Sequence, residues 1–308
     1  GVFDLGVTVQ NTSGLVLING GTIQNGLLNS NGMNFDGRSG LISANLGGSA
    51  GLYKSGEGSL TLSGASTFTG TTVITAGNLQ VGSSGTTGSL SPSGSITNNS
   101  ALWFKRSNTI TQGTDFGTIS GTGTLTQAGG GTLVLSSAND YSGDTSVNTG
   151  ILNIRHATAL GSTSGATAVA SGAALEIQGG ISVGAEGLTL NGSGISSGGA
   201  LRNISGNNDF GGLVTLASST RIHSNAGTLN LSNVGTIIGS GFARGGAIPT
   251  AVRDAAARFG VIADRDHDRR RVPGDDGRDT VVARRLQQAV PAHLPVVVGV
   301  DVDEPGGD

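Results

Sequence analysis

The sequence has no cysteine, little charge and few aromatic side chains for its 308 residues. The absence of cysteine is compatible with a protein that stays unfolded during export, although many cytosolic proteins share it. No apolar run is long enough to cross a membrane as a helix, since the best one, Ala289 to Val300, is broken by Pro291 and Pro295. The sequence therefore predicts neither a disulfide scaffold nor a transmembrane helix.

The scarcity of charge excludes whole classes of function. Residues 1–242 carry only 7 basic and 9 acidic side chains. A body with so few charges has no electrostatic footprint for nucleic acid or anionic lipid. It also has no dense acidic cluster and no Gly-Gly-x-Gly-x-Asp calcium repeat, which argues against a pectate-lyase-like groove. We expect no catalytic residues, no metal and no cofactor.

The composition changes abruptly near Phe242. Residues 1–242 hold 48 of the 56 glycines, whereas residues 243–308 hold 10 arginines, 11 acidic residues, five of the six prolines and no serine. We therefore predict a repeat body (1–242) and a short unrelated or disordered tail (243–308). An out-of-frame reading of GC-rich DNA would produce such a tail; a small separate domain or a charged linker are the alternatives. Since the chain starts at Gly1 without a signal peptide, we expect a fragment or a mature piece.

The body contains one segment that occurs twice. Leu60 to Val81 and Leu133 to Ile154 match position by position, and eight of the 22 aligned pairs are identical. A looser third copy, Ser205 to Gly212 with Ala226 to Leu231, has a longer spacing between its aromatic residue and its Ala-Gly step. We interpret the extra length as a loop. A fixed period indicates that the same structural unit recurs and packs in the same way along the chain.

Within each copy apolar residues alternate with polar ones, and Gly, Ser and Asn separate the alternating segments. This pattern predicts short strands with one buried face, joined by tight turns. A sandwich or barrel as long as the body would need a bulkier core than these few aromatics provide. A β-solenoid needs only small aliphatic residues inside, so we favour it. We expect about three coils of roughly 24 residues in each period, and about ten coils in all.

The copies resemble a known family. Lys54 to Val81 and Gln127 to Ile154 are similar to the autotransporter-associated β-strand repeat of Gram-negative passenger regions, and Gly199 to Leu231 resembles a variant of it. The resemblance implies a single-stranded, right-handed parallel β-helix, displayed outside the cell and carried across the outer membrane by a C-terminal β-barrel translocator. In such families the repeat assists folding and secretion. The tail from position 243 onward does not have the pattern of that barrel.

The resemblance implies a structural, secretion-assisting passenger fragment with an adhesive role and no enzymatic activity. We expect a monomer at the cell surface, with the translocator as its partner, an unidentified host or cell-surface ligand and no nucleic acid. Two alternatives stay open: a β-helical polysaccharide lyase or hydrolase, and a segment of a phage tail fibre. The lyase would cluster acidic or basic residues on one face, and the tail fibre would be a trimer.

Two side-chain groups could carry chemistry in the body. Asp140 and Asp144 bracket Tyr141 and could bind calcium or act as acid and base. Because threonines occupy the matching positions of the first copy, we favour a turn role for the pair. The segment Trp103 to Arg106 could bind a sugar or a partner. We favour a strand in which Trp103 or Phe104 points inward and the two cations lie in solvent.

The remaining candidates are weaker. His156 and His223 are isolated, and metal binding needs further ligands. The segments from Gly121 and from Ala128 resemble phosphate loops only in glycine content. In the tail, Asp264, Asp266 and Asp268 alternate as in a calcium loop, but the turn glycine is replaced, and we interpret the His267-Asp268 pair as a chance match. The tail also contains two candidate helices and one candidate strand: 251–259, 280–290 and 295–302.

Overall fold

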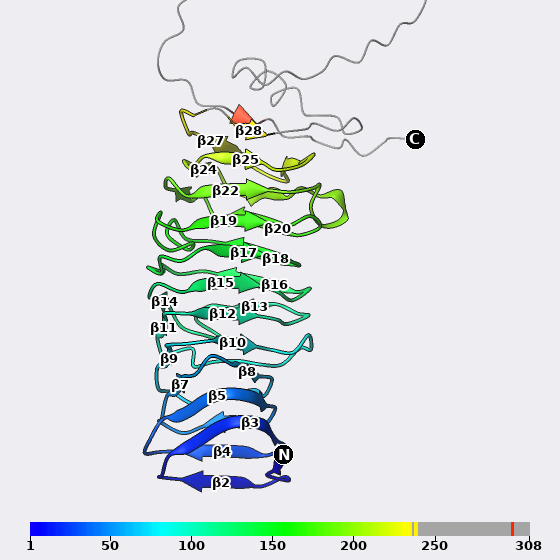
Figure 1. The fold of residues 1–308 in the computed structure, drawn as a ribbon. Coiled ribbons are helices and arrows are strands. Elements are labelled where there is room, and N and C mark those ends of the chain that lie inside the picture. The colour runs from blue at the N-terminus through cyan, green and yellow to red at the C-terminus, as the bar shows by residue number, and fades with distance from the viewer. Residues whose placement is uncertain (236, 240–296, 299–308) are drawn as a thin grey trace, which may run out of the picture.

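The computed structural model describes residues 1–235, 237–239 and 297–298. These residues form a rod of stacked coils that runs from the N-terminus to β28 (Figure 1). Every strand pair within the described rod is parallel; the one antiparallel pair joins β27 to β29 at its end. The expected all-β parallel solenoid is therefore confirmed, whereas the right-handed sense stays a prediction.

Each coil passes three faces in turn, which we number by chain order. Face 1 is formed by β1 (Val2–Asp4), the second half of β3 (Val16–Gln24) and of β5 (Phe35–Ile42), β8 (Ser59–Leu62), β10 (Asn78–Val81), β12 (Ala101–Phe104), β15 (Thr124–Gln127), β17 (Thr145–Val147), β19 (Ala166–Val169), β22 (Gly187–Leu190), β25 (Val214–Leu216) and β28 (Ile238–Gly239). Face 2 is formed by β2 (Val9–Thr12), β4 (Leu27–Ser30), β6 (Asn45–Gly47), β13 (Ile110–Thr111), β16 (Thr132–Leu135), β18 (Ile151–Ile154), β20 (Ala174–Gln178), β23 (Leu201–Ser205) and β26 (Ile222–Ser224).

Face 3 completes each coil. It contains the first halves of β3 and β5, followed by β7 (Leu52–Lys54), β9 (Thr72–Ile74), β11 (Ile96–Asn98), β14 (Ile119–Ser120), β21 (Ser182–Val183), β24 (Asn208–Phe210) and β27 (Leu229–Leu231), to which β29 (Val297–Val298) is added. A short 3-10 helix, η1 (Ile195–Ser197), lies in the connection from β22 to β23.

The strand register defines one unbroken column along face 1. It runs through Phe3, Ile23, Ile42, Leu62, Val81, Phe104, Gln127, Val147, Val169, Leu190, Leu216 and Gly239. Twelve successive positions make eleven coils, and the step is uneven: Leu62 to Val81 is among the shortest, and Leu190 to Leu216 is the longest. Coil length is therefore more variable, and mostly shorter, than the uniform length that the period suggested.

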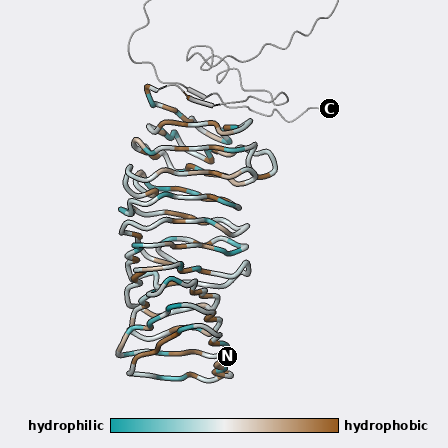
Figure 2. Tube along the Cα trace, in the orientation of Figure 1, coloured by the Kyte–Doolittle hydropathy of each residue, from teal (hydrophilic) through white to brown (hydrophobic). Residues whose placement is uncertain are grey.

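The core is one continuous cluster inside the rod, made of aliphatic residues with a few aromatic ones. Hydrophobic segments recur in coil after coil (Figure 2). Leu60 and Leu79, one coil apart, are opposite each other in register and fully buried. Each such aliphatic side chain contributes about 1.5–3 kcal/mol when buried. Stacking like residues on like residues therefore supplies the stability that a sandwich would take from bulkier side chains.

The two sequence copies occupy different faces. Leu60 lies on face 1. Leu79, Leu102 and Leu125 occupy the same register position in the next three coils of this face. Leu133, the equivalent of Leu60 in the second copy, follows Leu125 along the chain and lies on face 2. The period between the copies is thus three coils plus one face. The expectation that it divides into three equal coils is wrong for this reason.

The third copy keeps its corner but changes its length. Between Phe68 and Gly77 the first copy contains one strand, β9, whereas between Phe210 and Gly227 the third contains two, β25 and β26. The extra residues therefore add one further face and its strand. The interpretation of this insertion as a loop is wrong.

Most of the predicted tail lies outside the described residues. This applies to the alternating aspartates from Asp264, to the His267-Asp268 pair and to both candidate helices. Within the candidate strand 295–302, Val297–Val298 form β29, which pairs with β27. In the described residues, no helix has the length and hydropathy needed to cross a membrane.

Candidate functional site

The glycines shared by the two copies stand where backbones of neighbouring coils touch. Gly77 and Gly150 have positive φ angles of 65° and 70°. A Cβ atom on Gly77 would fall against the carbonyl oxygen of Gly58, and one on Gly150 against that of Gly129, well inside van der Waals contact. Both positions therefore require glycine for conformation and for space.

A buried donor stands below each of these corners. The Lys54 side chain is fully buried, and its Nζ donates hydrogen bonds to the carbonyl oxygens of Ser55 (2.9 Å), Gly56 (2.6 Å) and Ala76 (2.8 Å). Burial lowers the pKa of Lys54, and the nearby charges of Glu57 and Asp36 oppose that shift. Satisfying these acceptors matters because an unpaired buried carbonyl costs about 1–3 kcal/mol.

The same position is used again in the other copies. Gln127, the equivalent of Lys54, donates from Nε2 to the carbonyl oxygens of Gly129 and Gly131, both at 2.9 Å. In the third copy, Nδ2 of Asn203 donates to the carbonyl oxygen of Ala226 at 2.7 Å and to that of Gly206 at 3.1 Å. These residues close the corners of the coils, so the buried cation Lys54 has a structural role.

A polar cluster interrupts the apolar interior near the second copy. The hydroxyl groups of Tyr141 and Thr145 lie 2.7 Å apart, and the Thr167 hydroxyl donates to Oε1 of Glu186 at 2.9 Å. All four side chains are buried. Burial raises the pKa of Tyr141, and it raises the pKa of Glu186 to about 7 despite the hydrogen bond from Thr167. Phe68 and Thr72 hold the matching positions of the first copy, so Tyr141 adds one hydroxyl to an otherwise equivalent coil.

The segment Trp103 to Arg106 follows the favoured interpretation only in part. Phe104 is fully buried against Phe116, with ring centroids 4.6 Å apart, and Trp103 on the outer surface is 37% exposed. Arg106, however, is buried. The expectation that it lies in solvent is wrong, because it holds a loop in place, as described next.

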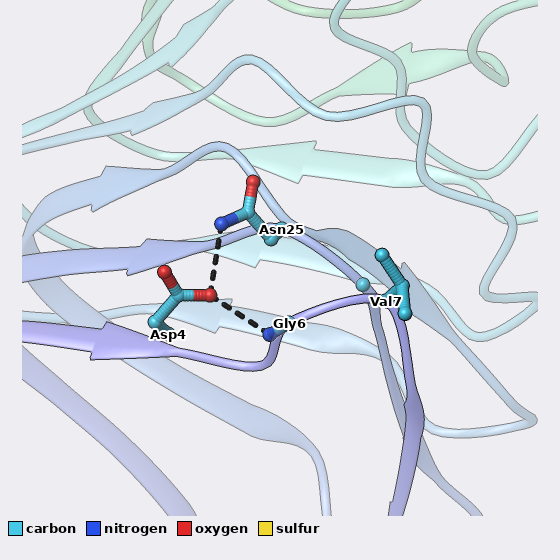
Figure 3. A pocket seen from close by; sticks show the side chains of 5 residues that line it. Asp4, Gly6, Val7 and Asn25 are labelled. Atoms are coloured by element: carbon cyan, nitrogen blue, oxygen red, sulfur yellow. Dashed lines mark hydrogen bonds between the residues drawn. The ribbon is translucent and has the colours of Figure 1, made fainter.

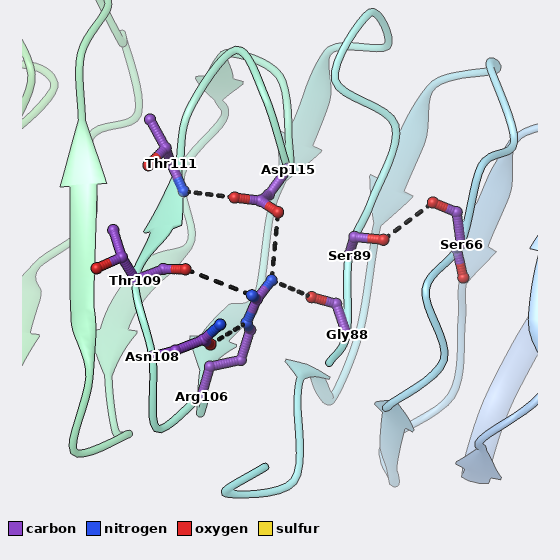
Figure 4. A network of polar contacts seen from close by, with 8 residues as sticks. All are labelled: Ser66, Gly88, Ser89, Arg106, Asn108, Thr109, Thr111 and Asp115. Carbon is purple, nitrogen blue, oxygen red and sulfur yellow. Dashed lines mark hydrogen bonds and ion pairs between the residues drawn. The ribbon is translucent and has the colours of Figure 1, made fainter. Parts of the chain in front are cut away.

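Arg106 connects the loop that follows β12 to the preceding coil (Figure 4). Its NH1 lies 3.3 Å from Oδ1 of Asp115 and donates to the Gly88 carbonyl oxygen at 3.0 Å. Its Nε donates to Oδ1 of Asn108 at 2.9 Å, and NH2 to the Thr109 carbonyl oxygen at 3.3 Å. The guanidinium group is therefore engaged by the rod itself and does not offer a docking cation.

The aspartate pair does not converge on a ligand. Asp144 is exposed, and its Oδ1 accepts a hydrogen bond from the backbone nitrogen of Ala166 in the next coil at 3.0 Å. This bond gives the carboxylate a structural contact between coils, and the favoured turn role stays a prediction. Asp140 is also exposed, and its backbone nitrogen donates to the carbonyl oxygen of Ile119. In the part of the chain that the structure describes, no group of three or more His, Cys, Asp or Glu residues could hold a metal ion.

The structure separates the two histidines and builds no helix directly after the glycine-rich segments. His156 is exposed and its Nδ1 lies 3.2 Å from the Thr158 hydroxyl, whereas His223 lies on β26. The segments from Gly121 and Ala128 continue directly into β15 and β16. A phosphate loop opens onto a helix N-terminus, so these two segments do not have that geometry.

A shallow hollow lies in the first coil, lined by Asp4, Gly6, Val7, Asn25 and Gly26 (Figure 3). The Asp4 carboxylate accepts hydrogen bonds from Asn25, Gln24 and the Gly6 backbone, each at 2.8 Å. These bonds, that from Asn25 most of all, lower the pKa of Asp4. The carboxylate thus has its partners within the coil.

Face 2 carries a charged network on its outward-facing side chains that the sequence does not predict. Nδ2 of Asn153 donates to Oε2 of Glu176 at 2.9 Å, and NH1 of Arg202 lies 3.0 Å from Oε1 of the same carboxylate. Nε of Arg155 donates to Oδ1 of Asn153 at 2.8 Å. These residues are far apart in the sequence, and the coil register that brings them together follows from uneven coil lengths.

The two copies also match a described repeat family. Residues 52–81 and 125–154 each match Passenger-associated-transport-repeat. This confirms the resemblance to the autotransporter-associated repeat for both segments. The matched ranges do not include the third copy.

One curated relative is the Adhesin BmaC autotransporter of Brucella suis biovar 1 (strain 1330). It is 36% identical over 121 residues, which cover 35% of this chain and 4% of the relative. The chain therefore spans a small fraction of that relative's length. No solved structure matches the chain.

Proposed function

We propose that this chain is a stretch of an autotransporter passenger that forms a stiff rod at the cell surface. The observation that carries the proposal is that each passenger-associated transport repeat closes one coil, Leu60 to Leu79 and Leu133 to Leu152, within one continuous stack. The name of the curated relative adds an adhesive role for the complete protein.

The repeats suit folding after export. Each coil forms its hydrogen bonds with the coil before it, so folding proceeds by adding one coil at a time to an existing end. Burial of the aliphatic columns supplies the free energy for each addition, and no ATP is needed outside the cell. The fixed glycine corners and the buried donors below them keep each added coil in register.

We also propose that the rod is non-catalytic and monomeric, and that a β-barrel translocator in the outer membrane is its partner during export. Light scattering of the purified chain tests the oligomeric state. A monomer is the expected result, and a trimer that resists SDS would favour the tail-fibre alternative instead.

Surface display tests the proposal. The full chain is placed between a signal peptide and a translocator barrel in a Gram-negative host, and protease is added outside the cells. We expect the wild-type rod at the surface, and loss of display for Gly77→Val with Gly150→Val, because both side chains would collide with the coil below.

Gly85→Val with Gly130→Val is the matched control, because a Cβ atom at either position meets nothing within 4 Å. This control should be displayed like the wild type. A wild-type chain that stays inside the cell, or a corner variant displayed as well as the control, would contradict the proposal.

A further inference from the structure

Charge on the later coils is divided between faces. From β15 to β27 in the described rod, Asp140, Asp144 and Asp209 lie on face 3 or at its corner with face 1. The basic residues of the same coils lie on face 2: Arg155 directly after β18, Arg202 in β23 and Arg221 directly before β26. The low net charge of the body therefore conceals a local basic strip.

Among the described residues of this strip, the only acidic one is paired. Glu176 in β20 bonds to Arg202 and Asn153 and is 8% exposed. Glu186, a further carboxyl of these coils, is buried inside the rod and contributes nothing to face 2. The surface that face 2 presents is therefore dominated by the guanidinium groups of Arg155 and Arg221, which are both exposed.

The rod holds each of these guanidinium groups by one nitrogen. Nε of Arg155 donates to Oδ1 of Asn153, NH1 of Arg202 pairs with Glu176, and NH1 of Arg221 donates to the Ser197 carbonyl oxygen at 3.0 Å. A side chain that is positioned in advance loses less conformational entropy on binding. The planar guanidinium group is also well suited to bind carboxylate or sulfate oxygens in pairs.

The three cations cross face 2 on a diagonal. Arg202 is in register with Asn153 and His223, so Arg155 lies two positions after this column along the strands and Arg221 two positions before it. The β18, β20, β23 and β26 strands stack in this order, so Arg155 and Arg202 are two rungs apart and Arg202 and Arg221 one rung. Three rungs of ~4.8 Å and an offset of four residues at ~3.3 Å each make the strip on the order of 20 Å long. An anionic ligand that matches it is linear and carries charges at short intervals.

We propose that face 2 between β18 and β26 binds a sulfated or carboxylated polysaccharide that crosses the face along this diagonal. The inference deepens the proposed adhesive function and depends on it for its biological meaning. A lipid surface fits less well, because the exposed large hydrophobic residues beyond β12 in the described rod are Leu213 and Val234, and neither lies in a face 2 strand. Anchoring to a membrane normally combines basic residues with apolar side chains that insert.

Binding of the purified full chain to immobilised dextran sulfate, with polygalacturonate as a carboxylated probe, tests this inference. Arg155→Gln with Arg221→Gln removes two cations from the strip. Arg38→Gln with Lys105→Gln removes the same charge elsewhere on the rod and is the matched control. Circular dichroism and melting curves of each variant establish that the rod is folded.

We expect the face 2 variant to lose at least tenfold in affinity for dextran sulfate and the control less than twofold. The dependence of log affinity on log salt should become shallower by up to about two, because two fewer cations release counterions. Equal losses in both variants, equal binding to uncharged dextran, or binding to phosphatidylserine vesicles without binding to dextran sulfate would overturn the inference.

The result is distinguishable from a failure of the proposed function. A rod that is displayed at the surface but ignores both polyanions overturns the ligand inference alone. A rod that binds dextran sulfate in solution but is never exported overturns the passenger proposal alone.

Discussion

Replacing Glu186 with glutamine should stabilise the rod at neutral and alkaline pH. The Glu186 carboxyl is buried at the corner between faces 3 and 1, is 3% exposed, and has the Thr167 hydroxyl as its hydrogen-bond donor. Burial raises its pKa from 4.5 to about 7, and the charge of Asp144 adds to this effect. The interior therefore favours the protonated form.

The sign of the pH dependence follows from this shift. Below about pH 4 the carboxyl is protonated in the folded and the unfolded chain, so it costs nothing. Between its unfolded and its folded pKa the unfolded chain loses the proton first, and the rod becomes progressively less stable. Above pH 7 the ionised carboxyl lowers the free energy of unfolding by its full amount, on the order of 3 kcal/mol, since a shift of one pKa unit corresponds to about 1.4 kcal/mol.

Urea unfolding followed by circular dichroism at pH 5 and pH 8 measures this cost. Because a solenoid can unfold in parts, hydrogen exchange of the amides in β17, β19 and β22 accompanies it. We expect the free energy of unfolding of Glu186→Gln to exceed that of the wild type by about 2–3 kcal/mol at pH 8 and by much less at pH 5. Asp140→Asn, which removes a charge at an exposed position, should show no such difference. A Glu186→Gln rod less stable than the wild type at pH 8 would refute the reasoning.

Three further predictions concern the coils themselves. Lys54→Met should destabilise the rod by about 2–4 kcal/mol, because it leaves three partly buried carbonyl oxygens without their donor. Lys54→Gln should cost less, because Gln127 closes the equivalent corner. Equal losses of the free energy of unfolding in urea would contradict this. Arg106→Met should make the loop from residue 107 to 116 sensitive to limited proteolysis and lower the free energy of unfolding by about 2–4 kcal/mol. Lys105→Met should have neither effect. A loop that stays resistant in Arg106→Met would show that the buried pair does not hold it. Deleting residues 79–101 removes one coil and places Leu102 over Leu60, so the far-ultraviolet circular dichroism spectrum should keep its sheet signal. Deleting residues 79–93 displaces the downstream strands by a third of a coil, so it should abolish cooperative unfolding. Equal behaviour of the two deletions would count against a register set by whole coils.

The sequence was sufficient to predict the architecture because the solenoid depends on local patterns. Alternation around Leu60 and Leu79 predicted short half-buried strands, and the glycines of the repeat predicted its corners. Coil length could not be predicted, because face connections range from tight turns to the loop that Arg106 holds, and only their sum sets the register. The offset of one face between the copies was hidden for that reason.

The same limit explains the missed surface. Asn153, Glu176 and Arg202 lie on three successive rungs of face 2, and nothing in the sequence marks them as neighbours until the coils are aligned. The position of Arg106 was predicted wrongly, because a cation after a strand is usually solvated. Its partner Asp115 lies at the end of a loop that folds back onto it, and the sequence does not show this fold.

Cysteine cross-linking tests the central claim, that the second repeat begins one face beyond the first. The chain has no cysteine of its own, so introduced pairs are the only ones present. In the register of face 1, Trp103 stands opposite Thr126, and Val134 lies one face further on. Neighbouring strand positions have the Cα separation that a disulfide needs. Trp103→Cys with Thr126→Cys should cross-link on mild oxidation, whereas Trp103→Cys with Val134→Cys should not; the reverse result would contradict the account.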